Sequence, residues 1–255
     1  MNDQPLTYDT TNNERELILP AINGTKALLS AAAKTGRVKR IVMTSSFASI
    51  VDINKKPGND FVYTGSDWNP LTYEEAIHPE TSAVVAYRGS KKFAELAAWD
   101  FVRDEKPSFD LVTFCPPMTF GPVVHPVRSA DELNESNARL WDVAIGKPLP
   151  EQRVPVWVDV RDLAQAHVEA LFRESAGMKR YAIASPENWS YEVAAAALNR
   201  KNGSGRAAEQ VVKSEGYKLD WKHVAENLGV EFHAFQECVM DLFDGLEKLG
   251  VSPKA

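Results

Sequence analysis

The sequence has little of what several protein classes require. It contains only two cysteines in 255 residues, Cys115 and Cys238, and no CxxC or HExxH motif, so neither a disulfide framework nor a metal centre is indicated. No apolar run approaches the ~20 residues of a membrane span, and the amino-terminal residues include no signal-peptide core. We therefore expect a cytoplasmic protein with reduced thiols, no bound metal and no contact with membrane.

A basic surface is also lacking. The chain has 29 lysines and arginines against 35 aspartates and glutamates, which gives a net charge of -6, and its basic residues form no block. This balance argues against nucleic acid as a partner. No GxSxG motif is present either, which argues against a hydrolase of that kind.

What the sequence does contain is an alternation of helical and strand patterns. Helical spacing of apolar residues spans 14–35, 85–105, 135–145 and 161–173, and most of the chain beyond 189 reads as helix. Short apolar runs at 40–46, 109–115, 154–160 and 180–185 read as strands, and 52–82 reads as a long surface excursion. The alternation predicts an α/β fold with a doubly wound parallel sheet.

One pair of residues indicates acid–base chemistry. Tyr87 and Lys91 stand four positions apart in a predicted helix, so their side chains share a face. A lysine ammonium there lowers the pKa of a phenol, which prepares it to exchange a proton near neutral pH. Because such a pair also arises by chance, it does not by itself establish catalysis.

Two strand ends add further candidates. Ser45 and Ser46 stand at the carboxyl end of the first strand, and ligands in open α/β sheets bind at the carboxyl ends of strands. The segment CPPMTFGP, residues 115–122, stands at the end of the second strand and predicts a rigid turn at the same edge. Each has a plainer alternative, a helix cap for the serines and a simple loop stop for the prolines.

The order of these features resembles the extended short-chain dehydrogenase/reductase family, a part of the NAD-dependent epimerase/dehydratase superfamily. The resemblance is strongest to the branch of dihydroflavonol, cinnamoyl-CoA and methylglyoxal/aldehyde reductases. It covers most of residues 12–190. The matching segments are NERELILPAINGTKALLSAA, VKRIVMTSSFASI, YRGSKKFAELAAWDFV, FDLVTFCPPMTFGP and VPVWVDVRDLAQAHVEAL.

The resemblance implies residue roles. Ser46, Tyr87 and Lys91 fall on the family's catalytic positions, with Tyr87 and Lys91 also binding the cofactor. The implied activity is reduction of an aldehyde or ketone to an alcohol with NADPH, or alternatively NAD. The proline turn, Pro116, Pro117 and Met118, is expected against the nicotinamide. Weaker candidates for the substrate wall are Phe47, Thr119, Val123 and Trp157, although core packing is the favoured alternative for Trp157. Gly89, within the motif, departs mildly from a helix-forming sequence.

The resemblance also implies a partial Rossmann fold. Residues 1–121, with 150–186 returning to them, are expected to form the remaining part of the dinucleotide-binding domain, and 122–255 mainly a smaller, mostly helical substrate lobe. No glycine-rich, phosphate-binding turn precedes residue 46, and the opening PLTYDTTNNER resembles the stretch after the family's fourth strand. We therefore expect the 255-residue chain alone to be a poor reductase, with its first strand exposed at an edge.

The sequence leaves two alternatives open. One is a non-catalytic or regulatory relic that keeps the three catalytic residues. The other is a hydroxysteroid dehydrogenase or sugar-nucleotide epimerase of the same superfamily, although FASIVD after Ser46 lacks the Tyr-Gly typical of the epimerases. The sequence does not define the carbonyl substrate or the oligomeric state.

Overall fold

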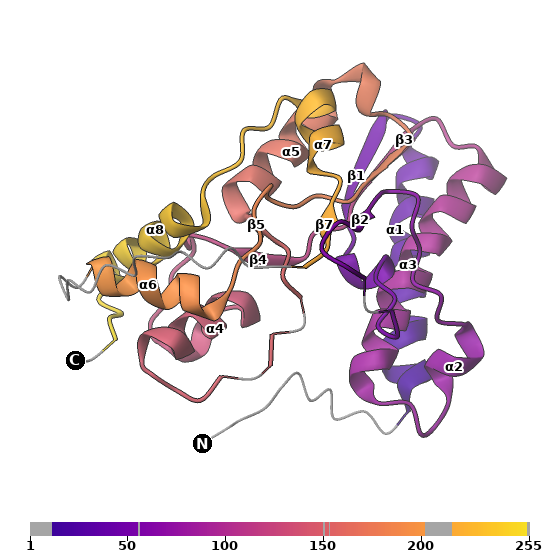
Figure 1. Cartoon of the computed structure of the whole chain (residues 1–255). Coiled ribbons are helices and arrows are strands. Elements are labelled where there is room, and N and C mark those ends of the chain that lie inside the picture. The colour runs from indigo at the N-terminus through magenta and orange to yellow at the C-terminus, as the bar shows by residue number, and fades with distance from the viewer. Residues whose placement is uncertain (1–11, 56, 150, 153, 202–215, 254–255) are drawn as a thin grey trace. The chain divides into compact units, whose positions relative to one another are not determined.

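The computed structural model describes the chain except residues 1–11, 56, 150, 153, 202–215 and 254–255 (Figure 1). It divides into two compact units. The first comprises the described residues of Met1–Lys56, Tyr63–Cys115 and Glu169–Ala182, and the second those of Pro57–Val62, Pro116–Val168 and Ile183–Ala255. The opening segment that resembles the family's fourth βα connection lies mostly outside the described residues. The functional division between two domains stays a prediction.

The first unit is built on a three-stranded parallel sheet. Its order is β1–β3–β6, and its strands are β1 (Arg40–Thr44), β3 (Asp110–Phe114) and β6 (Lys179–Tyr181). Thr44 pairs with Phe114, which pairs with Tyr181, so the carboxyl ends of the strands lie at one edge. The central strand β3 is buried from Leu111 onward, as its apolar run predicts. The expected Rossmann-like α/β fold is confirmed, although β6 is shorter than the expected strand.

Two long helices of this unit pack side by side (Figure 1). The first consists of η1 (Glu14–Ile18) and α1 (Leu19–Thr35), and the second is α3 (Ala83–Glu105). Pro20 lies in the first turn of α1, directly after η1, and Gly36 ends the helix with a left-handed φ of 62°. Leu29, Ala98 and Leu111 form the core between these helices and the sheet. The predicted helices and their ends are confirmed here.

The expected surface excursion contains more structure than its composition predicts. It includes β2 (Val62–Tyr63) and α2 (Tyr73–Ile77), and η2 (Phe47–Ser49) precedes it. Helix α2 begins with a capping box, in which Thr72 and Glu75 each bond the other's backbone N–H. The T-x-x-E spacing was therefore a usable signal for this helix, which the prediction of a long surface excursion did not include.

The second unit combines a short parallel strand pair with helices. Strand β4 (Met118–Phe120) pairs with β5 (Trp157–Asp159), so the expected proline turn becomes a strand after Pro117. Four aromatic rings, those of Phe120, Trp157, Trp189 and Phe235, pack in its core. Its other elements are η3 (Ala130–Glu132), α4 (Glu135–Ala144), α6 (Tyr191–Lys201), β7 (Lys218–Leu219), which pairs with β2, α7 (Trp221–Leu228) and α8 (Phe235–Lys248). The connecting α5 (Val160–Phe172) and η4 (Glu174–Ala176) complete the chain.

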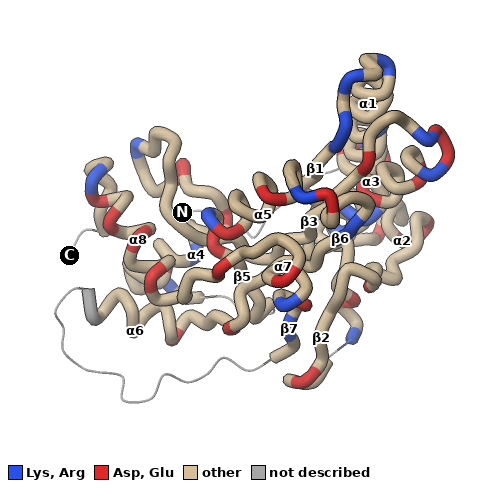
Figure 2. Tube along the Cα trace, turned by 90° about the horizontal axis from the view of Figure 1, so that it is seen from above, with Lys and Arg blue, Asp and Glu red and all other residues tan. Residues whose placement is uncertain are grey.

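The charged residues are distributed as the sequence predicts. Figure 2 shows basic and acidic residues interspersed along the trace rather than gathered on one element. Cys115 and Cys238 are both buried and free, and the reduced state of the thiols stays a prediction. Among the described residues, no helix is both long and apolar enough to cross a membrane.

Candidate functional site

Ser46 follows the carboxyl end of β1. It caps the single-turn helix η2, and its Oγ accepts a hydrogen bond of 3.1 Å from the N–H of Ala48. Because that bond uses a lone pair, the hydroxyl proton can still be donated to another group. Ser46 can therefore cap the helix and still donate a hydrogen bond at the end of the strand.

Tyr87 and Lys91 lie together on α3. The Nζ of Lys91 is 5.5 Å from the centroid of the Tyr87 ring, and both residues are half-buried. The next lysine, Lys92, turns away and donates a 2.6 Å hydrogen bond to the carbonyl of Leu71. Burial lowers the pKa of Lys92, against a smaller opposing effect of Glu75. The two adjacent lysines thus have different environments, and only Lys91 is placed beside the phenol.

Gly89 explains how this helix is positioned. A Cβ at Gly89 would lie 2.7 Å from the Cβ of Ala76 and 3.3 Å from Cδ2 of Leu71. The glycine therefore lets α2 approach α3 closely, which is a packing reason for a residue that weakens a helix. Helix α3 also packs against η2, so the helix carrying Tyr87 and Lys91 contacts the turn that follows Ser46.

A buried carboxylate lies next to this turn and was missed from the sequence. Glu95 is fully buried, and five nitrogen and oxygen donors lie within 3.2 Å of its two carboxylate oxygens. We call this the Glu95 cluster. The residues that supply the donors are Ser45, Ser49, Thr113 and Arg180. Glu95 stands four residues after Lys91, and this spacing was the available signal.

The electrostatics of the Glu95 cluster favour the charged carboxylate. Burial raises the pKa of Glu95, but the hydrogen bond and charge of Arg180, with the bonds from Ser45 and Ser49, outweigh it and hold the pKa below its ordinary value. Beside it, burial and then the charge of Glu95 raise the pKa of Cys115 to about 12. The ring of Trp68 also packs against the guanidinium group of Arg180, with 3.6 Å between the ring centroid and the guanidinium carbon.

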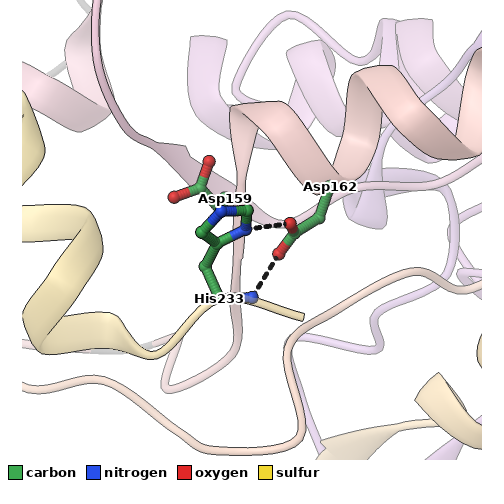
Figure 3. Close-up of side chains that lie close together, drawn as sticks. All are labelled: Asp159, Asp162 and His233. Atoms are coloured by element: carbon green, nitrogen blue, oxygen red, sulfur yellow. Dashed lines mark hydrogen bonds and ion pairs between the residues drawn. The ribbon is translucent and has the colours of Figure 1, made fainter. Parts of the chain in front are cut away.

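The second unit has its own polar cluster, shown in Figure 3. Asp162, at the start of α5, accepts hydrogen bonds from the backbone N–H and the Nδ1 of His233, and Asp159 lies beside them. Ligand atoms of these three residues lie within 4.8 Å of one another, so they could hold a metal ion. Asp159, however, is already paired with Arg161 at 2.8 Å, and burial raises the pKa of Asp162 despite the bonds from His233. Proteins bind metal through such groups, but here each carboxylate already has a protein partner.

The other predicted site residues fall in different surroundings. Phe47 is buried in the first unit, where its ring meets that of Tyr63 edge-on. Pro116 and Pro117 lie between β3 and β4, after Cys115, and Met118 and Thr119 lie in β4. Val123 packs partly buried against the core of the second unit. Trp157 is fully buried in that core, as the packing alternative predicts, and its Nε1 donates to the carbonyl of Glu187.

Comparisons with known proteins give a consistent set of relatives. No model of a known protein family matches the sequence. The chain is 38% identical over 237 residues to an oxidoreductase of Schizosaccharomyces pombe, covering 91% of this chain and 70% of that protein. It is 32% identical over 258 residues to the NADPH-dependent methylglyoxal reductase of Saccharomyces cerevisiae, covering 93% and 72%.

A solved structure shows the same relationship. The crystal structure of the yeast methylglyoxal/isovaleraldehyde reductase complexed with NADPH superposes with a TM-score of 0.82 at 29% identity. The match covers 97% of this chain and 75% of that one. Both the sequence and the fold of the described residues are thus similar to those of carbonyl reductases.

Proposed function

The chain is an oxidoreductase of the extended short-chain dehydrogenase/reductase family, and we propose that it reduces an aldehyde or ketone to an alcohol with NADPH. The observation that carries this proposal is the placement of Lys91 beside Tyr87 on a helix that packs against the turn of Ser46. The NADPH-dependent methylglyoxal reductases among its relatives support the choice of cofactor and of small carbonyl compounds as substrates.

In the proposed reaction, Ser46, Tyr87 and Lys91 have different roles. Ser46 donates a hydrogen bond from its hydroxyl to the carbonyl oxygen of the substrate and so orients it, while the serine oxygen accepts from the N–H of Ala48. Tyr87 transfers its phenolic proton to the oxygen as the alcohol forms. The ammonium of Lys91 stabilises the phenolate that remains.

The donor set on α3 fits the sugar end of a nicotinamide cofactor. A ribose diol can bind a hydroxyl and an ammonium, and α3 supplies both, with the Nζ of Lys91 5.5 Å from the centroid of the Tyr87 ring. Bound NADPH supplies the hydride for the carbonyl carbon. We propose that Pro116, Pro117 and Met118 line the nicotinamide, and that Phe47, Thr119 and Val123 contact the substrate.

The test uses two forms of the protein, with methylglyoxal and isovaleraldehyde as probes. One is the 255-residue chain, and the other is the same chain preceded by the amino-terminal segment of the Saccharomyces relative. We expect NADPH oxidation in the longer form and slower oxidation in the shorter one, because the phosphates of the cofactor need a backbone cradle. In the longer form Tyr87→Phe is expected to lower kcat/KM by more than about tenfold.

The adjacent lysines provide a matched control. Lys91→Met should weaken both NADPH binding and turnover, because one ammonium serves the ribose and the phenol. Lys92→Met should leave both within about twofold, since that side chain bonds the carbonyl of Leu71. Equal effects of the two substitutions, or no NADPH oxidation in either form, would overturn the proposed function and favour a non-catalytic relic.

A further inference from the structure

The turn that carries Ser46 is a single short turn with few hydrogen bonds of its own. It consists of the three-residue helix η2, closed by hydrogen bonds from the N–H groups of Ser49 and Ile50 to the carbonyls of Ser46 and Phe47. A single turn of this kind fixes several backbone angles for very few bonds, so it depends on outside contacts.

Two groups contact the turn from outside, and the contacts of the Glu95 cluster flank Ser46 on both sides. The other group is Asn69, whose side chain donates to the carbonyl of Ala48 at 3.0 Å and whose N–H donates to the carbonyl of Ser49 at 2.9 Å. The Oγ of Ser45 and the Oγ of Ser49 both lie 2.6 Å from the same carboxylate oxygen, Oε2 of Glu95. The hydroxyl of Ser49 is also 2.7 Å from the carbonyl oxygen of Ser46 itself. One buried oxygen therefore anchors the residue before Ser46 and the residue three positions after it.

Arg180 completes the arrangement from β6. Its Nη2 lies 3.1 Å from the Oγ of Ser49 and 3.2 Å from Oε2 of Glu95, while its Nε donates to Oε1 at 2.8 Å. The turn is thus bound to a charge pair that is nearly without solvent contact. Only a carboxylate accepts this set, because an amide would present N–H groups to donors.

We propose that Glu95 is a positioning residue of the reductase site, which acts through Ser49 and Ser45 to fix the hydroxyl of Ser46 for the substrate carbonyl. The inference rests on the proposed function, and it assigns to Glu95 no contact with substrate or cofactor. It predicts that loosening the Glu95–Ser49 bond slows turnover without weakening NADPH binding, because Lys91 and Tyr87 remain in place.

The chain offers a matched pair of substitutions for the test. Ser49→Ala and Thr113→Val each remove one hydroxyl from Glu95, bonded at 2.6 Å and 2.7 Å respectively, and both residues are fully buried. Only Ser49 belongs to the turn, since Thr113 lies on β3. Both substitutions are mild enough to leave the ion pair of Glu95 with Arg180 intact, and Glu95→Gln serves as the stronger variant.

The first measurement is hydrogen exchange on the 255-residue chain. Ser49→Ala and Glu95→Gln should speed exchange at residues 49–51 by about fivefold or more, whereas Thr113→Val should leave these amides within about twofold of wild type. The result that overturns the inference is equal exchange at residues 49–51 in the Ser49 and Thr113 variants. Because it needs no activity, this result is independent of whether the chain is a reductase.

The second measurement is the kinetics of the longer form. Ser49→Ala should lower kcat about tenfold with the Kd for NADPH unchanged. In a protein that already carries Ser46→Ala, adding Ser49→Ala should lower kcat by less than about a further twofold. Full additivity of the two substitutions would show that Ser49 does not act through Ser46. A wild-type protein that reduces no carbonyl contradicts the proposed function and removes the catalytic role of Glu95, while the exchange data still decide whether Glu95 holds the turn.

Discussion

Each of the two units buries carboxylates, and Glu95 in the first unit and Asp162 in the second differ in the direction of their pKa shifts. Glu95 in the first unit is paired with an arginine, whose charge is permanent, and its pKa is lowered. Asp162 in the second unit is paired with a histidine, and its pKa is raised. Burial acts in the same direction on both, so the partner decides which protonation state the fold prefers.

The largest expected effect is the loss of Glu95. Glu95→Ala leaves Arg180 buried without its counter-charge, and we expect the free energy of unfolding to fall by about 3–5 kcal/mol. Urea unfolding followed by circular dichroism measures the change. Glu105→Ala, at the exposed end of the same helix, is the control and should stay within about 0.5 kcal/mol. A loss below about 1 kcal/mol for Glu95→Ala would show that the pair contributes little.

The corresponding change in the second unit should cost less. His233→Ala removes the ring donor from Asp162 but keeps the backbone donor, so we expect a loss of about 1–3 kcal/mol. The same urea titration gives the value, with the exposed His125→Ala as its control. If this loss exceeds that of Glu95→Ala, the ranking of the two clusters is wrong.

The pH dependence should separate the two carboxylates by sign. The stabilisation by Glu95 is present above its ordinary pKa of about 4.5 and is lost as pH falls through the lower pKa of the folded state. For Asp162 the contribution is full below its ordinary pKa of about 3.8 and is lost as pH rises through the raised pKa of the folded state.

Unfolding free energies of the wild type, Glu95→Gln and Asp162→Asn across this pH range provide the measurement. The advantage of the wild type over Glu95→Gln should grow as pH rises, whereas its advantage over Asp162→Asn should shrink. Two slopes of the same sign would refute the comparison between the units.

The smallest expected effect concerns the thiols, one beside each cluster. Burial, followed by a nearby carboxylate, raises the pKa of both Cys115 and Cys238, so neither forms a thiolate near pH 8. We expect no alkylation by iodoacetamide in the folded protein and two alkylated cysteines in urea, measured by intact mass. Rapid labelling of either thiol in the folded state would mean that its surroundings open readily.

The sequence predicts local structure and motif positions well for physical reasons. The long periodic helices, the buried strands and the pair Tyr87 and Lys91 depend on residues close together in the chain, and spacing alone reveals them. Glu95 could be suspected only from its spacing after Lys91, because its partner Arg180 stands 85 positions away. The pairing of Asp162 with His233 over 71 positions was likewise out of reach. The strand at Met118–Phe120 was missed because two prolines precede it.

Helix α3 carries Tyr87, Lys91 and Glu95 at intervals of four residues. A rise of 1.5 Å per residue spaces the first and last by roughly 12 Å, and each interval turns the face by about 40°. The helix therefore fixes both the distances between these three residues and the directions in which they lie around its axis. One residue inserted between Lys91 and Glu95 would rotate the carboxylate by about 100° away from the serines. An insertion or deletion between these residues should therefore disturb the site even where no named side chain is changed.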